Sequence, residues 1–363
     1  MDATRARALL ARTPNLTAES LGALLEAAAG ELPAAASARA AARVELPPAA
    51  RACLASPDER ALDADLAWLA SSGTTIVLAS DAAYPPLLKQ TAGAPAALYV
   101  QGEVGLLAAP QLAMVGSRSP TASGRTTARE FAAWFARAGF TVTSGLATGI
   151  DAASHEGALA GGGTTIAVFA TGLDRVYPPE HAALAARIRA RGALVSEFPR
   201  GVAPLKTHFP RRNRIIAGLT LGTLVVEAAA GSGSLITARQ AAEAGREVFA
   251  IPGSIHSPLA RGCHQLIRGG AKLVESAHDV TEELGFSMAK EALTEPRAAH
   301  ERPRALDKEY EMLLDALGFE PATIDSLVAR TELPGASIAS MLLILELEGR
   351  VAALPGGRYG RAP

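Results

Sequence analysis

Short apolar runs alternate with amphipathic segments of helical length between residues 111 and 274. We expect strands at Leu112–Val115, Thr141–Thr143, Thr164–Phe169, Ala193–Ser196, Thr223–Val226, Glu247–Ile251 and Ala271–Val274. In the intervening segment Gly124–Gly139, Phe131, Phe135 and Ala138 share one helical face. Repeated strand–helix alternation predicts an α/β fold, in which a doubly wound parallel sheet carries helices on both faces.

The segments before this region have a different pattern. Residues 1 to about 75 are rich in Ala and Leu and predict a small helical module, with Thr17 or Asn15 as a helix cap. Residues 76–105 are expected to bridge this module to the sheet through short strands at Ile76–Ala79 and Ala97–Val100. We therefore place one domain at 1–75 and a second at 76–286.

The C-terminal region predicts a third domain. Residues 287–305 lose periodicity and gain proline and charge, which is typical of a linker. Helices are expected at Lys308–Leu317, Thr323–Arg330 and Ser337–Glu348, followed by a hairpin over Gly349–Tyr359. Three helices and a hairpin in this order predict a winged-helix domain at 306–363.

Composition limits the classes of function. The chain has 363 residues and a net charge of −1, so it is long enough for several domains and is not uniformly basic. Cys53 and Cys263 match no metal-ligand spacing, and we expect free thiols and no metal. The N-terminus lacks the apolar core of a signal peptide, and no apolar run approaches the ~20 residues of a membrane span. We expect a cytoplasmic protein with no membrane association.

Two glycine- and serine-containing loops follow predicted strands. The first begins with Gly116, Ser117 and Arg118, and the second comprises Gly231, Ser232, Gly233 and Ser234. Backbone N–H groups at the start of the following helices can bind phosphate oxygens, and Arg118 adds a planar fork for phosphate or base. The alternatives are a tight turn with a solvated arginine and a simple loop. Neither loop has the dinucleotide or Walker spacing, and we expect no cofactor.

A cationic tract lies between the two loops. No acidic residue occurs between Glu197 and Glu227, whereas the tract contains Lys206, Phe209, Arg211, Arg212, Asn213 and Arg214. Lys206 can neutralise a phosphate and Phe209 can stack on a base. Some of the arginines are expected to pair with distant acids, and Asn213 to hold the loop. Because no local acid balances the tract, we favour nucleic-acid contact.

Three further acidic or basic positions have competing interpretations. Asp151 and His155 lie four residues apart on one predicted helical face, but no third metal ligand is evident. We therefore expect Asp151 to cap its own turn, with His155 hydrogen-bonded nearby. Glu227 ends a strand before the second loop, and it is interpreted as a carboxylate that accepts from loop N–H groups, with a catalytic role as the alternative.

Five segments in this order resemble the DNA-processing protein A (DprA/Smf) family: Val115–Arg118, Ser144–Asp151, Phe209–Gly218, Gly231–Thr237 and Val248–Gly253. The resemblance is dense from about 80 to 285. It implies a Rossmann-like, mostly parallel sheet domain that binds single-stranded DNA, with a SAM-like helical module before it and a winged helix after it. It further implies that the protein protects incoming strands, helps load RecA in natural transformation, forms a homodimer and is not an enzyme.

The resemblance also assigns DNA-contact positions. These are Ser117 and Arg118, Lys206 and Phe209, and the loop Gly231–Ser234, while Arg211, Arg212 and Asn213 match the motif with either a structural or a contact role. A nucleotide-processing enzyme of the phosphoribohydrolase type, with Glu227 as its carboxylate, is the alternative function. A duplex-binding winged helix is a third hypothesis, which the acidic Glu346 and Glu348 weaken.

Overall fold

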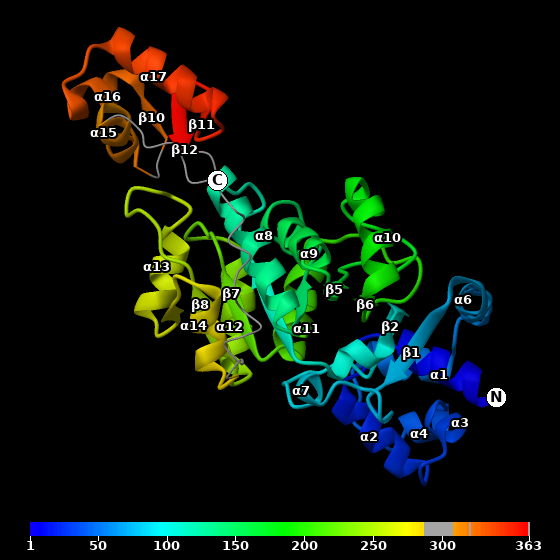
Figure 1. The fold of residues 1–363 in the computed structure, drawn as a ribbon. Coiled ribbons are helices and arrows are strands. Elements are labelled where there is room, and N and C mark those ends of the chain that lie inside the picture. The colour runs from blue at the N-terminus through cyan, green and yellow to red at the C-terminus, as the bar shows by residue number, and fades with distance from the viewer. Residues whose placement is uncertain (287–307, 319–320, 362–363) are drawn as a thin grey trace. The chain divides into compact units, whose positions relative to one another are not determined.

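Nine strands form one sheet in the order β1-β2-β6-β5-β4-β3-β7-β8-β9 (Figure 1). The strands are β1 Thr74–Leu78, β2 Ala97–Gly102, β3 Gln111–Val115, β4 Thr141–Ser144, β5 Thr165–Val168, β6 Ala193–Ser196, β7 Gly222–Val225, β8 Glu247–Ala250 and β9 Lys272–Leu273. Strands β3 to β9 are mutually parallel, whereas β1 and β2 add an antiparallel edge beside β6. The α/β fold and the predicted strands are confirmed.

The computed structural model describes residues 1–286, 308–318 and 321–361. The chain divides into two compact units, Met1–Met288 and Ala289–Pro363, which are described separately. The predicted linker at 287–305 lies outside the described residues. The four-part division of the chain stays a prediction.

Helices cover both faces of the sheet (Figure 1). Those between and after the parallel strands are α8 Ala122–Arg137, α9 Ile150–Ala160, α10 Ala182–Arg191, α11 His208–Leu219, α12 Ser234–Glu243, α13 Arg261–Arg268 and α14 Ala277–Glu283. The central strand β3 shows why two layers form. Its successive side chains point to opposite faces, so Leu112 and Met114 join one core cluster while Ala113 and Val115 join the other.

The N-terminal helices pack on the antiparallel edge of the sheet. They are α1 Ala3–Arg12, α2 Ala18–Ala27, α3 Leu32–Ala35, α4 Ala38–Ala41, α5 Pro48–Ala55, α6 Glu59–Ser72 and, after β1, α7 Pro86–Lys89. Leu9 and Leu62 belong to the same apolar cluster as Leu98 of β2. Thr17 caps α2 by accepting a hydrogen bond from the Ser20 N–H at 3.1 Å, and Asn15 instead has a left-handed backbone, with φ of 58°.

The order of the parallel strands creates a switch point. From β3 the chain proceeds outward through β4, β5 and β6, and it then returns to place β7 on the other side of β3. The loops that follow β3 and β7 therefore diverge in opposite directions and leave a crevice at their carboxyl ends. Open α/β sheets commonly bind ligands at this position.

The second unit is a winged helix with its own core. It contains α15 Lys308–Leu317, β10 Ala322–Thr323, α16 Ile324–Thr331, α17 Gly335–Leu347, β11 Val351–Leu354 and β12 Arg358–Arg361. The predicted helices and hairpin are present, and β10 adds a third strand in the order β10-β12-β11. Within the described ranges, no single helix is long and apolar enough to cross a membrane; the bent pair α16 and α17 passes that test together, by length and composition only.

Candidate nucleic-acid interface

A cavity of about 200 Å³ lies at the carboxyl ends of β3 and β7. Its lining includes Gly116 and Arg118 after β3, Phe209 and Asn213 of α11, and the segment Ser232–Ser234 after β7. Three segments that are separate in the sequence therefore converge at one rim of the sheet. The predicted parallel sheet explains this convergence, because the carboxyl ends of parallel strands share one edge.

The first loop is held by backbone contacts to the end of β7. The N–H of Ser117 donates to the Glu227 carbonyl at 2.7 Å. A Cβ added at Gly116 would lie 2.7 Å from Ile150 Cγ1 and 2.9 Å from the Glu227 carbonyl oxygen. Glycine at this position is thus explained by close packing within the protein, rather than by the approach of a ligand. The loop ends at Thr121, whose hydroxyl caps α8 by accepting from Gly124 N–H at 2.9 Å.

The side chain of Glu227 anchors the same loop. Its carboxylate accepts from the Thr121 backbone N–H at 2.9 Å and from the Thr121 hydroxyl at 2.6 Å. A Cβ at Gly124 would lie 2.3 Å from the carboxyl carbon, so the glycine makes room for this contact. The interpretation of Glu227 as a carboxylate that accepts from loop N–H groups is confirmed, although the loop is Gly116–Thr121 and not Gly231–Ser234.

The second loop leads directly into α12. The hydroxyl groups of Ser232 and Ser234 are hydrogen-bonded at 2.7 Å, and Ser234 N–H donates to Ser232 Oγ at 3.3 Å. Gly231 and Gly233 are exposed. Within residues 1–286, no hydrogen bond from the N–H of either glycine is found. These donors lie at the start of a helix, where the backbone dipole favours an anion.

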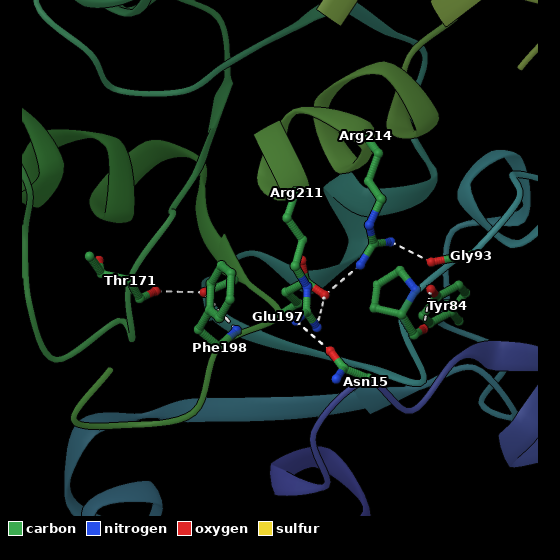
Figure 2. A network of polar contacts seen from close by, with 10 residues as sticks. Asn15, Tyr84, Gly93, Thr171, Glu197, Phe198, Arg211 and Arg214 are labelled. Atoms are coloured by element: carbon green, nitrogen blue, oxygen red, sulfur yellow. Dashed lines mark hydrogen bonds and ion pairs between the residues drawn. The ribbon is translucent and has the colours of Figure 1, made fainter. Parts of the chain in front are cut away.

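An acid at the end of β6 balances part of the cationic tract. The buried carboxylate of Glu197 binds the guanidinium groups of both Arg211 and Arg214 (Figure 2). Arg211 also donates to Asn15 Oδ1 at 2.8 Å, and Arg214 donates to the Gly93 carbonyl at 2.6 Å. The premise that no local acid balances the tract is therefore wrong. These two arginines join α11 to the N-terminal segment.

Arg212 is buried and has mainly backbone partners. Only 4% of the residue is exposed, and its Nη1 donates to the carbonyls of Gly145 and Val168, each at 2.6 Å. Its Nε donates to Asn213 Oδ1 at 3.1 Å. Burial lowers the pKa of Arg212 to about 10, while the nearby carboxylate of Asp151 opposes that shift. Arg212 thus ties the ends of β4 and β5 to α11 and also lines the cavity.

Lys206, Phe209 and Arg118 remain accessible or partly accessible. Lys206 and Arg118 are exposed, and in the described part of the chain neither makes an ion pair. The Arg118 guanidinium carbon lies over the Phe209 ring, 5.3 Å from its centroid. This distance fits a cation–π contact, which holds the arginine beside the aromatic side chain. Helix α11 begins at His208, so Phe209 lies in its first turn.

Asp151 and His155 have structural roles. Asp151 Oδ2 accepts from the N–H groups of Gly145 and Ala147 at 3.1 and 3.3 Å, and burial raises its pKa. His155 Nδ1 lies 2.7 Å from Thr165 Oγ1. Among the described residues there is no cluster of three potential metal ligands. The expected capping role of Asp151 is wrong, because the start of α9 has no side-chain cap and the carboxylate holds the preceding loop instead. His155 is bonded to β5 rather than beside Asp151.

Sequence reasoning missed Tyr177 and the role of Glu197. Tyr177 follows β5, and its ring centroid lies 5.9 Å from that of Phe209. An exposed aromatic residue in a loop after a parallel strand is the signal that could have identified it. Glu197 directly follows β6 and could have been paired with the tract by the same reasoning, since strand ends meet at one rim.

Comparison with known proteins identifies both units. A family model described as DNA recombination-mediator protein A matches residues 75–285, and a model described as the DprA winged helix domain matches residues 296–357. Protein Smf of Escherichia coli K12 is 44% identical over 303 residues, which cover 82% of this chain and 80% of that protein.

Solved structures agree with these matches. The crystal structure of DNA processing protein A from Streptococcus pneumoniae aligns with a TM-score of 0.62 and 37% identity, covering 77% of this chain and 97% of that one. The Helicobacter pylori protein, solved to describe its single-stranded DNA binding mode, aligns with a TM-score of 0.54 and 25% identity, covering 59% and 96%. The chain therefore belongs to the DNA recombination-mediator protein A family, which includes proteins named DprA and Smf.

Proposed function

We propose that this protein binds single-stranded DNA along the rim formed by the loops after β3, β7 and β6. The observation that carries the proposal is the convergence of Arg118, Phe209 and the Ser232–Ser234 loop around one cavity. Exposed N–H groups, a cation and an aromatic ring are the three kinds of partner that an unpaired strand requires.

Each group has a distinct task in this proposal. Lys206 and the N–H groups of Gly231 and Gly233 bind phosphates, while Phe209 and Arg118 offer flat surfaces to a base. Ser117 lies in the same loop as Arg118 and adds a hydroxyl donor. An unpaired strand fits better than a duplex, because its bases can turn outward and reach a ring near the cavity.

The remaining residues of the predicted site hold the proposed DNA-contact surface in place. Gly116 permits the close packing of the first loop, and Arg212 and Asn213 hold the start of α11. Arg211 is bound by both Glu197 and Asn15, and the exposed part of its side chain, 36%, is available to a phosphate. These positions are proposed to shape the contact surface rather than to supply most of the affinity.

Family membership and the chemistry of the rim support a proposal for the biological role. We propose that the protein covers incoming strands during natural transformation and helps to load RecA on them, acting as a homodimer in the cytoplasm without enzymatic activity. The published binding mode of the Helicobacter pylori relative with single-stranded DNA supports the first part of this role.

Fluorescence anisotropy with labelled oligo-dT tests the proposal. The double variant Arg118→Ala with Lys206→Ala is expected to bind at least about tenfold more weakly at low salt, because two phosphate or base contacts are lost. Wild-type affinity should fall steeply with salt concentration. Unchanged affinity in the double variant would place the DNA elsewhere on the molecule.

A further inference from the structure

Tyr177 presents an exposed aromatic ring next to the proposed DNA surface. Its exposed fraction is 44%, which is large for an aromatic side chain. The ring contacts Phe209 with a centroid separation of 5.9 Å and an interplanar angle of 58°. Phe209 in turn lies under the guanidinium of Arg118. Three flat groups, from the loops after β3 and β5 and from the first turn of α11, are thus in sequential contact.

The loop that carries Tyr177 is tied down at several points. The Thr171 carbonyl accepts from Ser196 Oγ at 2.6 Å, and Thr171 Oγ1 donates to the Arg175 carbonyl at 2.8 Å. The Gly201 N–H donates to Asp174 Oδ1 at 3.0 Å. The first bond ties the loop after β5 to β6, the second closes the loop on itself, and the third joins it to the loop after β6. The ring is therefore held in place, which lowers the entropy cost of ordering it on binding.

We propose that Tyr177 is a second base-stacking residue, which extends the path of the single strand from Phe209 across the carboxyl end of β5. This inference rests on the proposed function and names a contact beyond it. Base stacking on an aromatic side chain needs only an accessible ring face and tolerates any base.

The charges around Tyr177 favour a base over a phosphate at this position. Asp174 and Glu180 are exposed nearby in sequence and repel a phosphate, while Arg175 adds one positive charge. The phenol ring carries no charge at neutral pH. Stacking at Tyr177 therefore contributes affinity that depends weakly on salt, in contrast to the phosphate contact of Lys206.

Comparing oligo-dT with an abasic oligonucleotide of equal length tests this contact. Tyr177→Ala is expected to weaken oligo-dT binding at least about fivefold and to leave binding of the abasic strand within about twofold of wild type. The slope of log affinity against log salt should stay unchanged. Tyr177→Phe keeps the ring and should bind both strands like wild type, and Phe209→Ala should behave like Tyr177→Ala.

A Tyr177→Trp variant provides a direct signal that does not depend on a loss of binding. Oligo-dT should quench its added fluorescence, relative to the background of Trp68 and Trp134, and the abasic strand should not. If Tyr177→Ala loses the same affinity for oligo-dT and for the abasic strand, the stacking role is wrong. It is also wrong if oligo-dT does not quench the fluorescence of Tyr177→Trp. If wild type itself fails to bind oligo-dT, the proposed function is wrong. If wild type binds and Tyr177→Ala binds equally well, only this inference is wrong.

Discussion

The carboxylate of Glu227 accepts two hydrogen bonds from Thr121, a residue 106 positions earlier in the chain. The contact joins the end of β7 to the loop after β3, across the switch point of the sheet. The carboxylate that a nucleotide-cleaving enzyme would need is thus hydrogen-bonded to the first loop and holds its shape.

Glu227→Gln is expected to lower the free energy of unfolding by about 1–2 kcal/mol, because charge-assisted bonds to Thr121 are weakened. Oligo-dT affinity should also fall, since Arg118 lies on the loosened loop. Urea denaturation and anisotropy measure the two effects. In a double-mutant cycle with Thr121→Val, the stability effects should be non-additive. Additive effects would mean that the two side chains do not act together.

Glu197→Gln is expected to destabilise the protein by about 1–3 kcal/mol, because two guanidinium groups lose the charged partner that they share. Partial exposure of Arg211 and Arg214 keeps the effect below that of a fully buried pair. Glu156→Gln is the matched control, since its pair with Arg129 is exposed at the surface and contributes little. Equal losses in the two variants, measured by urea denaturation, would argue against a special role for Glu197.

Lys206→Ala should reduce the slope of log affinity against log salt by about 1, since one phosphate contact and its released counterion are lost. Oligo-dT titrations between low and moderate salt measure this slope. Arg129→Ala removes a positive charge from the outer surface of α8 and should leave the slope unchanged. A slope that is identical in wild type and Lys206→Ala would show that Lys206 does not neutralise a phosphate.

His155 should make the first unit less stable as the pH falls. The Thr165 hydroxyl donates to the Val142 carbonyl, so its oxygen accepts from His155 Nδ1–H, and the ring is neutral. His155 Nε2 is buried without a partner among the described residues. Burial lowers the pKa of His155 to about 3, with smaller contributions from the charges of His181 and Arg212.

The sign of the pH effect follows from proton binding. In the unfolded protein the pKa of His155 is about 6.5. Below that pH the unfolded protein binds a proton at His155 and the folded protein does not, so the free energy of unfolding falls as the pH falls. The loss attributable to His155 should reach about 2 kcal/mol at pH 5 relative to pH 7. Urea unfolding followed by the fluorescence of Trp68 and Trp134 measures it. A His155→Asn variant should show a shallower pH dependence between 7 and 5, and an unchanged slope would contradict the assignment.

The sequence by itself determined the alternation of strands and helices, the winged-helix order and the loops that meet at the rim. Apolar strands such as Leu112–Val115 can be predicted from the sequence, because a strand buried on both faces needs an unbroken apolar run. The parallel direction of the predicted strands places the following loops on one edge of the sheet. The strand order, which sets β7 beside β3 and so brings Arg118 near Ser232, came only from the structure.

Only the tertiary structure decided which partners the arginines of α11 bind. Arg211, Arg212 and Arg214 are indistinguishable as sequence letters, yet two of them bind Glu197 and one is buried against backbone carbonyls. The difference arises because neighbouring residues of a helix point in different directions. Each arginine therefore contacts the groups that lie on its own side of α11. Tyr177 escaped notice for the same reason, since its contact with Phe209 exists only after β5 and α11 are brought together.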